Sequence, residues 1–290
     1  MRWLISTDGT PRSQQAAVFA AKLLNPEQDE VILLGISNKG DEQALGQSLK
    51  ELEAMLSGIV IKRVVKDGPT AEVIETVAFQ ENVNITLYGS RGRKGLAKVL
   101  FGSVAARLAH DIPSSVLIVR RAPLPIEHIL ICTTLDRFHL GPIRMGGMLA
   151  HITDADVTLL HVMSQIPLSE KAPEDQLQLS AKQAIEQRTR EGLGLLRAQQ
   201  ILSEYGVKSE TLIRHGLVID EILEEVVTGN YELVVIGAHG ESTGQRWQDL
   251  FVEDITNTIL LDTRCPVLIV RKSPQNHINE TDELSEYEAT

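Results

Sequence analysis

Small and cationic residues follow an apolar segment in the first half of the chain, at a spacing that suits a phosphate chain. The pattern reads Gly89-Ser90-Arg91-Gly92, then nine residues, then Gly102-Ser103. Gly92 lets the backbone approach a ligand closely because it has no Cβ. Gly102-Ser103 opens a helix, where free N–H groups and the helix dipole attract anions and the serine hydroxyl can donate. With Arg91 adding positive charge, the spacing indicates phosphate binding.

A second interpretation of this loop stays open. The glycines could serve only turns, and Ser103 could act only as a helix N-cap. The complete G-x2-G-x9-G-S string favours phosphate binding, because it follows a buried strand inside a strand–helix repeat. It is not the Walker A string, since no Gly-Lys-Ser/Thr occurs at a strand–helix junction, and it is not G-x-G-x-x-G.

Short apolar runs alternate with helical patterns around this loop. The runs are continuous rather than alternating in polarity, which is typical of parallel strands buried on both faces. Thr10 followed by Pro11 predicts a helix start, with a hydroxyl cap and proline at the first helical position. The alternation predicts a doubly wound parallel sheet with right-handed crossovers. In the first half the predicted strands are residues 2–7, 31–36, 60–65, 85–88 and 115–119, and the helices 11–24, 41–56, 70–81 and 103–110.

The sequence also repeats itself. Trp3–Thr7 and Glu30–Leu34 match segments 126 positions later, Ile85–Gly92 matches 148 positions later, and Val116–Arg121 matches 151 positions later. The offset grows only between matched blocks, as insertions in loops or helix ends would produce. The second copy gains 22 residues before its third strand, and a long helix over about Glu174–Tyr205 is predicted to absorb them.

The predicted fold is therefore α/β, with two tandem doubly wound domains that each contain a five-stranded parallel sheet. We predict a first domain over residues 1–121, a linker over 122–126 and a second domain over 127–272. The acidic segment 273–290 is expected to be a disordered, solvated tail.

Over about residues 1–272 the chain resembles a tandem universal stress protein. The first copy carries Ile5-Ser6-Thr7-Asp8-Gly9 after its first strand, Ile32–Ile36 at its second, the G-x2-G-x9-G-S loop, and Pro113–Val119. The resemblance implies Rossmann-like domains of the adenine-nucleotide-binding type. It also implies a stress-response regulator with ATP as ligand, alone or with Mg²⁺ or Mn²⁺.

The resemblance also implies which residues form the binding site. The loop would hold the phosphates and ribose, the acid after the first strand would contact the nucleoside, and the residue at Ile36 would meet adenine. Asp8 could instead only complement a helix dipole. The implied site residues are Thr7, Asp8, Ile36, Gly89, Arg91, Gly92, Gly102, Ser103 and Val104.

The second copy departs from this pattern. Gly237 and Gly240 remain, but Glu253-Asp254 stands where the first copy has Gly102-Ser103, and Thr134 stands at the position of Asp8. A carboxylate at a helix start repels a polyphosphate, since two like charges about 4 Å apart cost about 4 kcal/mol at an effective dielectric of 20. We therefore predict ATP in the first copy only.

Composition excludes several classes of protein. Residues 1–121 carry 15 Lys+Arg against 13 Asp+Glu, and residues 122–290 carry 13 against 26. The net charge of −11 disfavours nucleic acid as a partner. No apolar run reaches a membrane span, and the opening segment has no cleavage region of a signal peptide, so we expect a cytoplasmic protein. Cys132 and Cys265 lack metal-type spacing, and Cys132 is expected to be a buried small hydrophobe.

Three functional hypotheses follow. In the first, the protein is a binding and signalling module rather than an enzyme, and the last strands, Val116–Val119 and Val267–Val270, pair within the chain to give a pseudo-dimer. A further homodimer and unknown protein partners are compatible with it. In the second, Asp8 supports slow ATP hydrolysis or phosphoryl transfer. In the third, the protein is a carrier or scaffold in which neither copy uses ATP, and the degenerate second copy binds an apolar or cationic ligand or a partner protein. His215, His239 and Glu253 have no metal-ligand spacing, and Trp247 is expected to pack or to cover a pocket.

Overall fold

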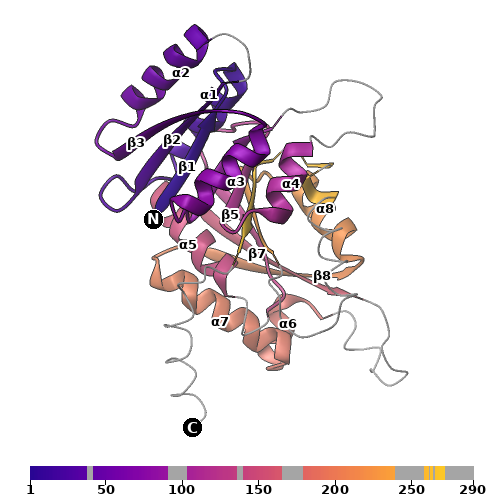
Figure 1. The fold of residues 1–290 in the computed structure, drawn as a ribbon. Coiled ribbons are helices and arrows are strands. Elements are labelled where there is room, and N and C mark those ends of the chain that lie inside the picture. The colour runs from indigo at the N-terminus through magenta and orange to yellow at the C-terminus, as the bar shows by residue number, and fades with distance from the viewer. Residues whose placement is uncertain are drawn as a thin grey trace.

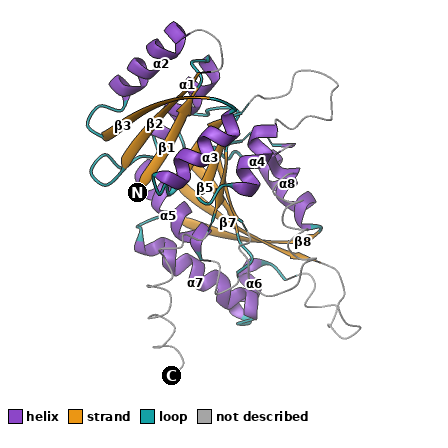
Figure 2. Ribbon diagram, viewed as in Figure 1, coloured by secondary structure: helices purple, strands orange, loops and turns teal. Residues whose placement is uncertain are grey.

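The computed structural model describes residues 1–37, 42–90, 103–135, 140–164, 179–238, 258–260, 262–263 and 265–271. The ten strands within this part of the chain form one sheet, in the order β3-β2-β1-β4-β5-β10-β9-β6-β7-β8. Helices cover both faces of the sheet, and β3 and β8 lie at its two ends (Figures 1 and 2). None of the helices so described is long and apolar enough to cross a membrane.

The first half confirms the predicted doubly wound arrangement. Its strands are parallel, in the order β3-β2-β1-β4-β5. Strands β2 and β3 therefore lie on one side of β1, and β4 and β5 lie on the other side. The elements are β1 (Arg2–Thr7), α1 (Pro11–Ala21), β2 (Glu30–Ser37), α2 (Glu42–Met55), β3 (Val60–Asp67), α3 (Thr70–Gln80), β4 (Ile85–Gly89), α4 (Ser103–Asp111) and β5 (Ser115–Val119).

The second half repeats this order with one change in its helices. Its elements are β6 (His128–Cys132), α5 (Gly141–Thr153), β7 (Asp156–Ser164), α6 (Ala181–Glu186), α7 (Arg190–Glu204), β8 (Ser209–Gly216), α8 (Val218–Thr228), β9 (Leu233–Gly237) and β10 (Val267–Val270). The long helix predicted over Glu174–Tyr205 is wrong, because α6 and α7 are separate. Arg188 has a left-handed φ of 53°, and Thr189 then caps α7 by accepting a bond from the Gly192 N–H.

The two halves join through their last strands, as the sequence predicted. β10 pairs antiparallel with β5, with Val267 opposite Ile118 and Ile269 opposite Val116. Alternate residues of both strands enter two apolar cores, one on each face of the sheet. One core lies beneath α1, α2, α5 and α7 and the other beneath α3, α4 and α8, so each core is continuous across the junction.

Two arginines, one from each half, donate hydrogen bonds across this junction. Arg120, directly after β5, donates from Nη1 to the carbonyl of Thr263 over 3.1 Å. Arg271, directly after β10, donates from Nη2 to the carbonyls of Ala109 and His110, the second at 2.8 Å. Ala109 and His110 lie in the last turn of α4, where carbonyls have no partner within the helix. The arginine of each half therefore satisfies backbone oxygens of the other half.

Candidate functional site

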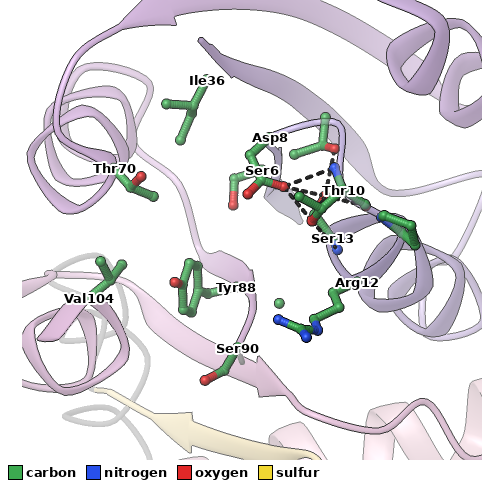
Figure 3. Close-up of a pocket in the computed structure, with 13 residues that line it drawn as sticks. Ser6, Asp8, Thr10, Arg12, Ser13, Ile36, Thr70, Tyr88, Ser90 and Val104 are labelled. Atoms are coloured by element: carbon green, nitrogen blue, oxygen red, sulfur yellow. Dashed lines mark hydrogen bonds between the residues drawn. The ribbon is translucent and has the colours of Figure 1, made fainter. Parts of the chain in front are cut away.

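A polar cavity of about 660 Å³ opens at the carboxyl edge of the first half. It lies where β1, β2 and β4 end, which is the switch point of this half of the sheet, the usual ligand position in doubly wound folds. Figure 3 shows the side chains around it. The lining residues are Ser6, Thr7, Asp8, Thr10, Pro11, Arg12, Ser13, Ile36, Thr70, Tyr88, Gly89, Ser90 and Val104.

Asp8 stands at the centre of a hydroxyl-rich turn between β1 and α1. Its Oδ1 accepts from the Thr10 N–H at 3.1 Å, from the Thr10 hydroxyl at 2.6 Å and from the Ser13 hydroxyl at 2.9 Å. None of these three donors is charged, and no described residue donates to Oδ2. The carboxylate is thus held in a fixed orientation, with one oxygen still available to a ligand (Figure 3).

These hydrogen bonds keep Asp8 ionised. Partial burial by itself raises the pKa of Asp8, but the bonds donated by Thr10 and Ser13 together outweigh it, so the pKa lies below the usual value for an aspartate. Asp8 is accordingly a carboxylate, and hence only an acceptor, at neutral pH. It suits a ligand that presents hydroxyl or N–H donors.

A series of buried hydroxyl groups is hydrogen-bonded to this carboxylate and holds it in place. The Ser13 hydroxyl has two acceptors at 2.9 Å, Asp8 Oδ1 and the Thr10 carbonyl, so its one proton is shared between them and it accepts from Thr7 Oγ1, which also lies 2.9 Å away. Thr7 has then used its own proton, so Ser48 of α2 donates to Thr7 over 3.1 Å. The hydrogen-bonded series Ser48, Thr7, Ser13, Asp8 ties the turn to α2.

A glycine on each side lets the chain pack closely at this edge. Gly9 has a left-handed φ of 78°, and a Cβ there would lie 2.9 Å from the backbone nitrogen of Leu45. A Cβ at Gly89 would lie 3.1 Å from the Cα of Ser13. Gly89 is the last residue of β4, and its lack of a side chain lets the first turn of α1 pack against this strand.

The opposite wall of the cavity is less polar and contains two more helix starts. Ile36 closes β2 and Val104 lies in the first turn of α4, while Thr70 is the first residue of α3. Helices α1, α3 and α4 all begin at this edge of the sheet, and the positive ends of their dipoles favour an anion nearby. Thr10 caps α1 and Pro11 follows it, as the sequence predicted.

Five of the nine implied site residues line the cavity: Thr7, Asp8, Ile36, Gly89 and Val104. Arg91, Gly92 and Gly102 lie outside the described residues. Ser103 is the first residue of α4, in agreement with the predicted helix start, but its side chain is likewise not described. The sequence analysis did not assign Ser6, Thr10, Arg12, Ser13, Thr70, Tyr88 and Ser90 to the site, and these also line the cavity.

The second half keeps the backbone of this turn but not its chemistry. The Leu135 N–H donates to Thr133 Oγ1 at 3.1 Å, just as the Gly9 N–H donates to Thr7 Oγ1 at 3.1 Å. Thr134 takes the place of Asp8, and His161 takes the place of Gly35. The imidazole of His161 donates from Nδ1 to the Thr133 carbonyl at 3.0 Å. Burial lowers the pKa of His161, so this ring is neutral at neutral pH.

Cys132, Cys265 and His215 do not line the cavity. Burial raises the pKa of Cys132 and of Cys265 to about 12, which keeps both free thiols protonated and unreactive at neutral pH. His215 donates from Nε2 to the Leu179 carbonyl at 3.1 Å, while His239, Trp247, Glu253 and Asp254 lie outside the described residues. Within the described ranges, no group of three His, Cys, Asp or Glu side chains could hold a metal ion.

The fold and the cavity define a doubly wound α/β protein with a polar ligand pocket at a switch point. Comparison with known proteins makes this more specific. The model of the universal stress protein family matches residues 1–120 and again residues 125–271. The chain therefore belongs to the universal stress protein family and carries two copies of its domain.

Individual relatives agree with this assignment. A universal stress protein of Methanocaldococcus jannaschii is 26% identical over 137 residues, which are 41% of this chain and 81% of that protein. One of Synechocystis is 33% identical over 78 residues, 27% of this chain and 47% of that protein. A universal stress protein of Archaeoglobus fulgidus superposes with a TM-score of 0.64 at 15% identity, covering 93% of this chain and 98% of the other. A functionally unknown protein of Pseudomonas aeruginosa gives 0.65 at 18% identity, covering 99% and 97%.

Proposed function

We propose that this protein is a stress-response regulator that binds one adenine nucleotide, ATP, in its first half alone. The observation that carries the proposal is the cavity between β1 and β4, because it combines a fixed carboxylate with three helix N-termini at one edge of the sheet. Its volume of about 660 Å³ lies within the range of pockets that enclose ligands of nucleotide size.

Each part of the cavity suits one part of a nucleotide. Ile36 offers an apolar contact for the base at the end of β2. Asp8 offers a carboxylate oxygen to the ribose hydroxyls, which are donors. The loop from Gly89 to Gly102-Ser103 and the start of α4 would receive the phosphates. A divalent ion, Mg²⁺ or Mn²⁺, would arrive bound to the phosphate oxygens.

The position of α4 supports a regulatory role. Val104, in its first turn, lines the cavity, and its last turn accepts two hydrogen bonds from Arg271 of the second half. α4 therefore runs from the proposed phosphate position to the junction between the halves. A nucleotide that shifts α4 would bias how the two halves pack, and a partner protein could respond to that difference.

Binding stoichiometry and a charge-inserting variant test the proposal. Native mass spectrometry and isothermal titration with ATP should give one nucleotide per chain. The double change Gly102→Glu and Ser103→Asp gives the first half the acidic pair of the second half, and it should weaken ATP binding by about a hundredfold or more, given about 4 kcal/mol of repulsion per close pair of like charges.

A matched double variant provides the control. Glu253→Gln with Asp254→Asn neutralises the corresponding pair in the second half and should leave binding in the first half unchanged. Two nucleotides per wild-type chain would contradict the restriction to the first half. Equal ATP binding by wild type and the Gly102→Glu, Ser103→Asp variant would contradict the site.

A further inference from the structure

We propose that Arg12 binds the phosphate groups of the nucleotide and makes the pocket selective for phosphorylated nucleosides. This inference rests on the proposed function, and it adds to it a residue outside the glycine loop. Arg12 is exposed at the start of α1 and lines the cavity beside Gly89 and Ser90. Figure 3 shows its guanidinium directed toward the end of β4.

The backbone of Arg12 lies against the end of β4. Pro11 occupies the first turn of α1, where its fixed φ suits a helix start. A Cβ at Gly89 would lie 3.2 Å from the carbonyl oxygen of Arg12, so a side chain there would push the start of α1 away from β4. The side chain of Arg12 therefore starts next to the residue from which the loop departs.

The charges of the cavity are separated rather than paired. Asp8 and Arg12 are four positions apart, yet Asp8 takes its three hydrogen bonds from backbone and hydroxyl donors. Within the described part of the chain, Arg12 forms no hydrogen bond or ion pair. A carboxylate and a guanidinium that leave each other free complement a ligand with donors at one end and negative charge at the other.

The order of the strands gives this ligand a direction. The cavity crosses the ends of β2, β1 and β4, with Ile36 at β2, Asp8 just after β1, and Arg12 against the end of β4 (Figure 3). A nucleoside whose base contacts Ile36 and whose ribose contacts Asp8 extends its phosphates toward β4. Arginine binds phosphate in a bidentate fashion, which gives geometric selectivity as well as charge.

The test compares adenosine, AMP and ATP by isothermal titration with full-length wild type, Arg12→Ala and Arg12→Lys. Arg12→Ala should weaken ATP binding by about tenfold to a hundredfold, as expected for the loss of a hydrogen bond to a charged group. It should weaken AMP binding less and leave adenosine binding unchanged. Arg12→Lys should recover part of the ATP affinity, because it restores the charge without the bidentate geometry.

Lys22→Ala is the matched control, because Lys22 is exposed at the other end of α1 and its removal changes the net charge equally. If Lys22→Ala weakened ATP binding as much as Arg12→Ala, the effect would come from overall charge, and the inference would fail. Equal losses for adenosine and ATP would assign Arg12 a structural role and also overturn it. If ATP bound wild type and Arg12→Ala equally, this inference alone would fall; if wild type bound none of the three ligands, the proposed function would fall with it.

Discussion

The turn after β1 and the turn after β6 have the same backbone and reversed packing. In each, a threonine hydroxyl accepts from the N–H two residues later, and that later residue is left-handed, with φ of 78° at Gly9 and 56° at Leu135. A Cβ at Gly9 would lie 2.9 Å from the backbone nitrogen of Leu45. In the second half the glycine is on the helix instead, and a Cβ at Gly194 would lie 2.9 Å from the Cβ of Leu135.

This reversal separates what the fold requires from what the site requires. The fold needs the left-handed turn and one small residue at the turn–helix contact, and either side can supply that residue. The first half places the small residue in the turn, which leaves room there for Asp8 and its hydroxyl donors. The second half places Leu135 in the turn and His161 where the first half has Gly35, so side chains stand at two positions where the first half has glycines packed against α2.

The largest effect is expected from Gly9→Ala, which adds a side chain to the first turn. In the second half Gly194 makes room for Leu135, but in the first half the turn faces Leu45 rather than a glycine. The added Cβ would meet the backbone of α2 and would occupy a left-handed conformation, so the free energy of unfolding should fall by about 2–4 kcal/mol. Urea denaturation followed by circular dichroism would measure it.

Gly206→Ala separates the two causes. Gly206 has a similar φ of 72°, but nothing lies within 4 Å of its Cβ position, so this variant should lose only about 1 kcal/mol. If both variants lost the same free energy of unfolding, the close contact between the first turn and α2 would contribute nothing to the loss. The exchange of glycine between turn and helix would then have no effect on packing.

The next largest effect concerns the junction, where an arginine of each half donates to backbone carbonyls of the other half. Arg271→Ala removes the donors to the Ala109 and His110 carbonyls and should lower the free energy of unfolding by about 2–3 kcal/mol, the range for hydrogen bonds from charged groups. Arg63→Ala, which breaks only a surface ion pair with Glu53 at 3.6 Å, should change it by less than about 1 kcal/mol. Equal losses in the two variants would mean that Arg271 does not hold the halves together.

The sequence predicted the fold well because its signals are local and repeated. Continuous apolar runs located the strands of the first half within about two residues, and the family resemblance led to the predicted pairing of β5 with β10. The long helix after β7 was wrong because helical periodicity continues through Arg188, where only the backbone conformation reveals the break. Thr189 is a good N-cap, and that was the one local signal that could have located the start of α7.

The site was predicted only in part, because its missing members are brought together by folding. Gly89 followed from motif spacing and Asp8 from the family resemblance, but Ser13 and Ser48 have no spacing that links them to Asp8. They come together only when α2 packs over the turn at Gly9. Arg12 was missed because an exposed arginine at a helix start is ordinary in sequence, and its position against β4 depends on Gly89.

A third prediction compares two threonine caps, one in the cavity and one outside it. Thr10→Ala and Thr189→Ala each remove an N-cap hydroxyl and should each lower the free energy of unfolding by about 1 kcal/mol. Only Thr10 also donates to Asp8, so only Thr10→Ala should weaken ATP binding, by about fivefold. Thermal denaturation and isothermal titration of both variants would measure the two effects. A matching loss of affinity in Thr189→Ala would show that helix stability, rather than the orientation of Asp8, controls binding.

The smallest effect is electrostatic and belongs to the first turn alone, because Thr134 in the second turn does not ionise. Since folding lowers the pKa of Asp8, the folded state favours the carboxylate, and this stabilisation is complete above the pKa of an unfolded aspartate, about 3.9. It should be lost as the pH falls through the lower, folded pKa. Asp8 is largely exposed, so the contribution is a few tenths of a kcal/mol after solvent screening. Urea unfolding of wild type and Asp8→Asn between about pH 6 and pH 3 should therefore show a difference in stability that shrinks toward low pH. A difference that stays constant or grows toward low pH would mean that the hydroxyl donors do not favour the ionised form, and the charge of Asp8 would then not distinguish the two turns.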